Sequence, residues 1–163
     1  MLRYFLLIAS LVAATPAFAQ APEGWLVRID KSENASDPDD RPDIKFATMG
    51  KGFHITGGPA GTFWNPTNTV SGDFTASATF TLMKPSGHVN YYGLIIGGAD
   101  LDKPTQSYIY FLIAQNGTYT LRHRSGTEVH DIQARVKHDA IQQPGSSGQS
   151  VNSLEVRVAG DTI

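Results

Sequence analysis

Residues 73–83 read DFTASATFTLM, and this stretch decides the fold class. Its apolar side chains occupy alternate positions, namely Phe74, Ala76, Ala78, Phe80 and Leu82. Most of the positions between them carry Thr or Ser hydroxyls. Because successive side chains of a β-strand point to opposite faces, the pattern predicts a strand with one core face and one hydroxyl-rich face.

The rest of the chain also favours short strands, and no long helical period appears. Further strands are expected at residues 25–29, 52–56, 62–65, 91–97, 107–114, 117–124, 127–133 and 153–159. Residues 91–97 and 107–114 are apolar on both faces, which is typical of strands in the middle of a covered sheet. Gly, Pro, Asn and Asp separate the strands, so the chain is predicted to form an all-β antiparallel sandwich of the jelly-roll kind.

The N-terminus has the pattern of a targeting signal. Arg3 supplies a positive charge, residues 4–14 are apolar but too few to span a bilayer, and Ala17-Phe18-Ala19 is a small-x-small cleavage site. We therefore expect residues 1–19 to be a signal peptide cut before Gln20, and a periplasmic or secreted protein. The alternative is a buried N-terminal helix, which fits Thr15-Pro16 less well.

Residues 20–163 are expected to be a single domain, because 163 − 19 = 144 residues can bury one core. The chain has no Cys, which excludes thiol catalysis, thiolate metal sites and a lipid-anchored lipoprotein. Removing Arg3 leaves 12 basic and 15 acidic side chains, a net charge of −3 with no basic block. Neither nucleic acid nor membrane insertion is expected.

The C-terminal residues predict a strand that has only begun. Gly160-Asp161 is a hairpin turn signal, and Thr162-Ile163 would start the return strand. A sandwich ending there would leave an edge strand exposed. We expect a domain that lacks its last strand, and the alternative is a frayed natural end.

Several stretches together resemble small exported domains of the concanavalin A-like lectin/glucanase superfamily, including its laminin-G-like and 3-keto-disaccharide hydrolase-like members. They are residues 57–66 (GGPAGTFWNP), 72–80 (GDFTASATF), 92–102 (YGLIIGGADLD), 106–111 (QSYIYF) and 152–158 (NSLEVRV). The resemblance implies a jelly roll of two curved sheets and a further strand after Ile163. It does not choose among lectins, glycosidases and adhesion modules, since one fold hosts many functions.

Glucanase chemistry of this superfamily is not expected. Retaining glycosidases need two carboxyl groups about 5 Å apart, which a Glu-x-Asp-x-Glu strand pattern supplies. The glutamates of this chain are Glu23, Glu33, Glu128 and Glu155, and none lies in such a pattern.

Asp100 and Asp102 are the candidate metal ligands, for Ca²⁺ if any cofactor is bound. Carboxylates two residues apart with carbonyls nearby can hold Ca²⁺, but Asp side chains in turns more often bond neighbouring amides. The acidic segment at residues 37–43 has the same two interpretations, and it lacks the Gly of an EF-hand loop.

The hairpin around Ser125-Gly126 supplies the candidate catalytic residues. If these two residues form the loop, Arg124 pairs with Thr127 and His123 pairs with Glu128. His123, Glu128 and His130 then share a face with Tyr119 and Leu121, where they could serve acid–base chemistry or hold a metal. A bulged three-residue turn would separate them. The alternative role is charge pairing on a solvated face.

The candidate glycan-binding residues are Trp64, Asn65, Tyr91, Tyr108, Arg122 and Arg124. Aromatic rings stack on the C–H face of a sugar, and neighbouring amide and guanidinium groups bond its hydroxyls. The alternative is that the aromatic side chains are core, which is expected most strongly for Tyr110 in the middle of an apolar strand. Gln106 and Asn90 could add hydrogen bonds.

Three functions remain open at this level. A glycan-binding domain without glucanase chemistry is favoured, with the hydroxyl row of residues 75–81 as a possible contact face. The alternatives are a glycoside hydrolase of the 3-keto-disaccharide hydrolase type, using His123, Glu128 and His130, and a structural envelope protein without a ligand. Oligomeric state is not predicted.

Overall fold

The computed structural model describes residues 21–30, 44–57 and 60–160, which form ten β-strands and no helix. The strands are β1 (Leu26–Ile29), β2 (Lys45–Met49), β3 (Gly52–Thr56), β4 (Gly61–Trp64), β5 (Phe74–Leu82), β6 (Tyr91–Ala99), β7 (Ser107–Ala114), β8 (Thr118–Ser125), β9 (Glu128–Lys137) and β10 (Ser150–Val158). All pairings are antiparallel, which confirms the all-β fold class. Within these residues, no helix with the length and apolar character of a membrane span was found.

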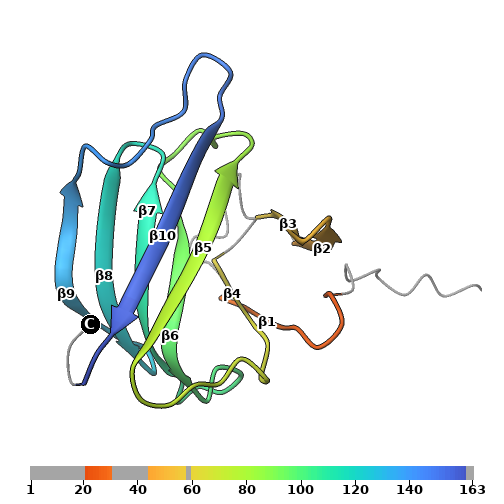
Figure 1. The fold of residues 1–163 in the computed structure, drawn as a ribbon, viewed down its shortest axis with the longest axis vertical. Helices are drawn as coiled ribbons and strands as arrows, with labels where there is room; N and C mark the ends of the chain where they lie inside the picture. Colours follow the sequence, from red (N-terminus) through yellow and green to blue (C-terminus); the bar gives the residue numbers. More distant parts are fainter. Residues whose placement is uncertain (1–20, 31–43, 58–59, 161–163) are drawn as a thin grey trace, which may run out of the picture.

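The larger sheet has the order β6-β7-β8-β9 (Figure 1). Residues directly opposite each other in antiparallel strands share a face, so the register divides this sheet into two sets of side chains. The ring of Tyr92 contacts Phe80 of β5, with centroids 5.6 Å apart, so its set faces the smaller sheet and is called the inner face. The opposite set, which includes Tyr108 and Tyr110, is called the outer face.

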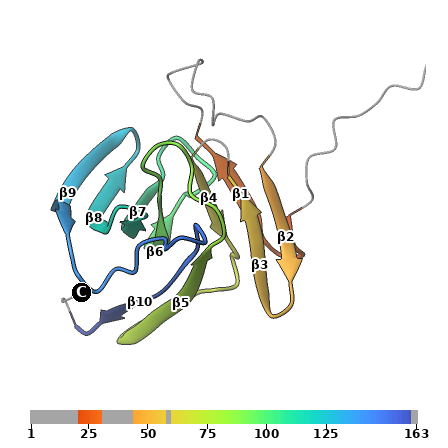
Figure 2. The same ribbon diagram turned by 90° about the horizontal axis from the view of Figure 1, so that it is seen from above.

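The smaller sheet pairs β5 with β10 in register over nine residues and crosses in front of the larger one (Figures 1 and 2). Burial alternates strictly along both strands, as the sequence pattern predicts: Leu154 and Val156 are buried, while Ser153 and Glu155 are exposed. Asn152 is also buried and points its amide nitrogen to the Tyr92 hydroxyl at 3.4 Å. The two sheets therefore enclose a core between β5–β10 and β6–β7.

Two short ribbons, β1–β4 and β2–β3, lie to one side of β6 (Figures 1 and 2). An aromatic cluster joins them, since Phe46 contacts Trp25, Phe53 and Phe63 with ring centroids 4.9–5.6 Å apart. Phe46 is only 2% exposed. Strand β2 was not predicted from the sequence.

Strand positions in the larger sheet differ from expectation in one respect. β7 is central and covered, as predicted, but β6 lies at the edge of the described sheet rather than in its middle. At the other edge, every residue of β9 is exposed on both faces. The smaller sheet therefore covers the β6–β7 side of the larger sheet, and β9 extends beyond it.

Three sequence-based expectations concern residues outside the described ranges. They are the signal peptide at residues 1–19, the acidic segment at residues 37–43, and the turn and return strand that would follow Gly160.

Candidate functional site

The outer face of β7 and β8 brings together four side chains that could contact a glycan. Tyr108 lies directly opposite Arg124, and Tyr110 lies directly opposite Arg122. Because the residues alternate by two along each strand, the two tyrosines and the two arginines form neighbouring rows on one face. We call this group the Tyr–Arg cluster.

The two tyrosines differ in exposure. Tyr108 is 6% exposed and cannot offer its ring face to a ligand, whereas Tyr110 is half-buried rather than fully in the core as expected. Their ring centroids are 5.7 Å apart at an angle of 49°. Burial raises the pKa of the Tyr110 hydroxyl, and a hydrogen bond with Arg122 opposes part of that rise. Tyr108 thus supports Tyr110, whose ring remains partly accessible.

Partners on β9 and in the β8–β9 turn hold the arginines of the cluster. Arg122 forms an ion pair with Asp131 of β9, and Arg124 donates from Nε to the carbonyl oxygen of Gly126 at 3.1 Å. Guanidinium groups fixed in this way lose little conformational entropy when they bind a further acceptor. The cluster is therefore preorganised for polar recognition.

The end of β1 adds residues that the sequence analysis missed. Arg28 Nε lies 3.1 Å from Asp30 Oδ1, and Arg124 Nη1 lies 3.7 Å from Asp30 Oδ2. Arg28 also donates to the carbonyl oxygen of Lys103 at 2.6 Å. The contacts with Lys103 and Arg124 join residues 75 and 94 (124 − 30) positions apart, and no local pattern could have revealed them.

Gln106 lies one position before β7, so strand alternation places it on the same face as Tyr108 and Tyr110. It is 1% exposed, and neither Nε2 nor Oε1 has a hydrogen-bond partner among the described residues. A buried amide without partners costs about 1–3 kcal/mol per polar group. The end of the cluster therefore holds a buried side-chain amide whose nitrogen and oxygen both lack a hydrogen-bond partner among the described residues.

The other proposed glycan-binding residues lie apart from the cluster. Trp64 ends β4 opposite Leu26 and is half-buried. Asn65 is engaged locally, since its Oδ1 accepts from the Thr67 amide at 3.0 Å and the Thr67 hydroxyl at 2.8 Å. Tyr91 is on the outer face at the far end of β6; its hydroxyl is 2.8 Å from Thr118 Oγ1, and the Arg135 guanidinium lies over its ring at 5.0 Å.

The proposed catalytic residues share a face, but their register was wrong. Gly126 and Thr127 form the turn, so His123 pairs with His130 rather than Glu128, and Arg124 pairs with Val129 rather than Thr127. The physical reason is the backbone of Gly126, whose φ of 59° suits glycine at the first central position of a two-residue turn. A shift of two positions keeps the parity of the strand, so His123, Glu128 and His130 remain together with Tyr119 and Leu121 on the inner face.

This histidine group lies in an open part of the inner face. The imidazoles of His123 and His130 are stacked with centroids 6.1 Å apart, and His130 Nε2 is 3.4 Å from Glu128 Oε2. His123 Nε2 also lies 3.0 Å from Ser107 Oγ. A hollow of about 440 Å³ adjoins them, lined by Gly97, Tyr108, Ile109, His123, His130 and Ile132. Glu128 is 75% exposed, so water screens its attraction for His130.

Asp100 behaves as a turn residue. Its φ is 50°, and its carboxylate accepts from Lys103 Nζ at 2.7 Å and from Thr105 Oγ1 at 3.1 Å. These contacts, the Lys103 hydrogen bond first, lower the pKa of Asp100. Within the described ranges, no three His, Cys, Asp or Glu residues are grouped so that they could hold a metal ion, and a Ca²⁺ site at Asp100 and Asp102 stays a prediction.

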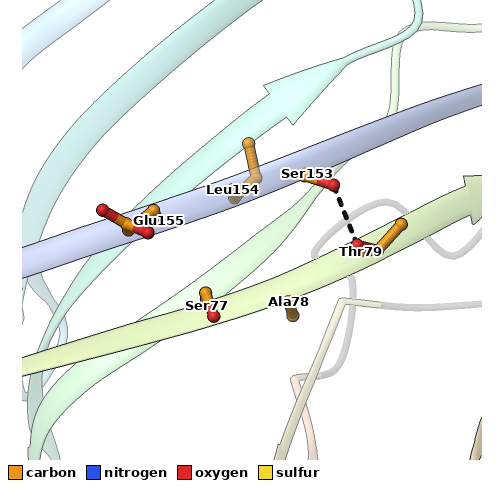
Figure 3. Close-up of a pocket in the computed structure, with 6 residues that line it drawn as sticks. All are labelled: Ser77, Ala78, Thr79, Ser153, Leu154 and Glu155. Atoms are coloured by element: carbon orange, nitrogen blue, oxygen red, sulfur yellow. Dashed lines mark hydrogen bonds between the residues drawn. The ribbon is translucent and has the colours of Figure 1, made fainter.

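The hydroxyl row of β5 forms the outward surface of the smaller sheet (Figure 3). A hollow of about 440 Å³ there is lined by Ser77, Ala78, Thr79, Ser153, Leu154 and Glu155. The Thr79 and Ser153 hydroxyls bond each other across the strands at 2.8 Å (Figure 3). No aromatic side chain lines this hollow, so a sugar ring would find no stacking surface in it.

The chain was compared with protein-family models, with curated proteins and with solved structures, and none of these comparisons found a match.

Proposed function

We propose that this protein is an exported glycan-binding domain whose ligand contacts the Tyr–Arg cluster on the outer face of the larger sheet. The observation that carries the proposal is the cross-strand pairing of Tyr108 with Arg124 and of Tyr110 with Arg122. The proposal rests also on the sequence resemblance to concanavalin A-like domains, and it includes the jelly-roll arrangement which that resemblance implies.

Stacking on Tyr110 would supply the apolar part of recognition. A half-buried ring braced by a second ring gives a rigid platform for the C–H face of a pyranose. Tyr110 sits mid-strand in a central strand, so the platform does not depend on a loop.

The guanidinium groups of Arg122 and Arg124 would supply the polar part. Each presents several N–H donors in a fixed plane, which suits neighbouring sugar hydroxyls. The unpaired amide of Gln106 favours the same interpretation, because a hydroxyl that reached it would remove the cost of burying it.

A glycan array tests the proposal, using the protein with and without Ca²⁺ together with its Tyr110→Ala and His130→Ala variants. We expect binding to a defined set of glycans that weakens about tenfold or more in Tyr110→Ala, in line with the loss of one stacked aromatic ring. His130→Ala is the matched control, because it truncates an exposed ring on the opposite face.

The outcomes separate clearly when circular dichroism shows that each variant is folded. Binding that survives in Tyr110→Ala but fails in Trp64→Ala would move the site to the β1–β4 ribbon. Binding that requires Ca²⁺ would assign Asp100 and Asp102 as ligands. If the folded protein binds no glycan, the proposal is wrong.

One observation favours an enzyme as the second candidate, of the 3-keto-disaccharide hydrolase type. His123, Glu128 and His130 share one face beside the inner-face hollow. Such a group could transfer protons to and from a glycosidic substrate. A turnover assay on 3-keto-disaccharides tests it: activity lost in both His130→Ala and Glu128→Gln would favour the enzyme, and no turnover would exclude it.

A further inference from the structure

We propose that the glycan recognised by the Tyr–Arg cluster is acidic, and that its carboxylate or sulfate docks between Arg28 and Arg124. This inference rests on the proposed function and names the class of its ligand. It depends on three features of the end of the cluster next to β1.

The first feature is the sharing of one carboxylate by two cations. Asp30 Oδ1 lies 3.1 Å from Arg28 Nε, and Asp30 Oδ2 lies 3.7 Å from Arg124 Nη1, which is a longer and weaker contact. All three side chains are about three-quarters buried, so solvent screens the two guanidinium groups from each other only in part. A second anion between them would lower their mutual repulsion.

The second feature is spare donor capacity. A guanidinium group has five N–H donors. Among the described residues, Arg28 donates to Asp30 and to the Lys103 carbonyl. Arg124 donates to the Gly126 carbonyl and reaches Asp30 only at ion-pair distance. The remaining N–H groups are available for a carboxylate or sulfate, which arginine binds in a bidentate manner.

The third feature is the pairing of the adjoining loop. Lys103 Nζ is 2.7 Å from Asp100 Oδ1 and is also attracted by Asp102. With one ammonium group and two carboxylates (1 − 2 = −1) the loop has a net negative charge, so Lys103 is already paired and offers no free cation to the ligand. With the anion at the Arg28–Arg124 end, the sugar ring would extend toward Tyr110, which pairs with Arg122, two residues along β8 from Arg124.

Isothermal titration calorimetry tests this with four probes: a galacturonic acid hexamer, its methyl ester, a sulfated galactan hexamer and a neutral galactan hexamer. The methyl ester keeps the shape of the first probe and removes its charge. We expect an anionic probe to bind at least about tenfold more tightly than its neutral counterpart, and 0.5 M salt to reduce that advantage. Preference for the uronate or the sulfate probe identifies the source of the anion.

Two variants locate the site. Arg124→Gln and Arg28→Gln should each remove most of the preference for the anionic probe. Arg157→Gln is the matched control, because Arg157 is exposed on β10 opposite Thr75 and away from the cluster. It should leave the preference unchanged.

The outcomes distinguish the preference for an acidic glycan from the proposed glycan-binding function itself. Equal affinity for charged and neutral probes, or a preference that survives in both arginine variants, overturns the inference and leaves glycan binding standing. If no probe and no array glycan binds, both fail. If an arginine variant does not fold, the methyl-ester and salt comparisons on the unaltered protein still decide.

Discussion

Strands β7 and β9 belong to the same sheet, yet their surroundings are opposite. On β7, Ile113 is 1% exposed under the smaller sheet and Tyr108 is 6% exposed on the outer face. On β9, Ile132 is 55% exposed, and no residue of the strand is buried. Residue type and coverage both contribute to the difference, because β7 reads SYIYFLIA whereas β9 reads EVHDIQARVK, in which polar and charged residues predominate.

The difference in coverage between β7 and β9 affects which side chains are held in place before a ligand binds. The Tyr–Arg cluster is built equally on β7 and β8, where packing and fixed partners restrict its rotamers. The group of His123, Glu128 and His130 is built across the exposed edge, where side chains exchange their contacts with water. This contrast supports the proposal that a ligand contacts the first group.

Truncating one isoleucine on each strand is the most direct test of the difference between β7 and β9. Ile113→Ala should lower the free energy of unfolding by about 2–5 kcal/mol, because it leaves a cavity in the core. Ile132→Ala should change it by no more than about 0.5 kcal/mol, since its side chain is already in water. Urea unfolding measures both; similar losses would show that β9 is covered in solution.

Hydrogen exchange compares the local stability of β7 and β9 without mutation. Amides of β9 should exchange at least about tenfold faster than those of β7, because an edge strand with two register shifts opens locally more easily. Exchange followed by NMR gives this residue by residue. Equal protection along both strands would contradict the exposed position of β9.

Titration of Tyr110 tests the covered outer face. Its folded-state pKa is raised by burial, so the neutral phenol is favoured and its stabilisation is complete below the unfolded value of about 10. That contribution is lost as the pH rises through the folded value. Arg122→Gln should raise the pKa further, because the arginine favours the ionised form. An unchanged Tyr110 pKa, measured by ultraviolet absorbance or NMR, would mean that the two groups do not meet.

The smallest effect is expected in the exposed loop between β6 and β7. The pKa of Asp100 is lowered by Lys103, so the pair stabilises the fold above the unfolded value of about 3.9 and ceases to do so as the pH falls through the folded value. Lys103→Gln should return the Asp100 titration toward its ordinary range with little change in stability. An unchanged titration curve, followed by NMR, would show that the ion pair does not form.

Much of the fold follows from local pattern. The period of two in β5 and β10 predicts which residues face the core, and the structure confirms it for Phe80, Leu154 and Val156. Gly126 marks a turn, but Ser125-Gly126 and Gly126-Thr127 are both plausible loops by composition, so the register could not be fixed from sequence.

The candidate site was only partly predictable. Tyr108, Arg122 and Arg124 were chosen from residue type, and their common face follows from the register of β7 with β8. The roles of Arg28 and Asp30 depend on where the end of β1 meets the larger sheet, a contact across more than 90 residues. No periodicity or spacing within a strand reports such a contact.

The central claim is that ligand binding uses the outer face of β7 and β8. The measurement that tests it most directly is NMR chemical-shift mapping, with the isotopically labelled protein titrated with its best array glycan. We predict that the shifts concentrate at Tyr108, Tyr110, Arg122 and Arg124, and that His130 moves little. Shifts concentrated at His123 and His130, with the Tyr–Arg cluster unperturbed, would contradict the account and place binding in the inner-face hollow.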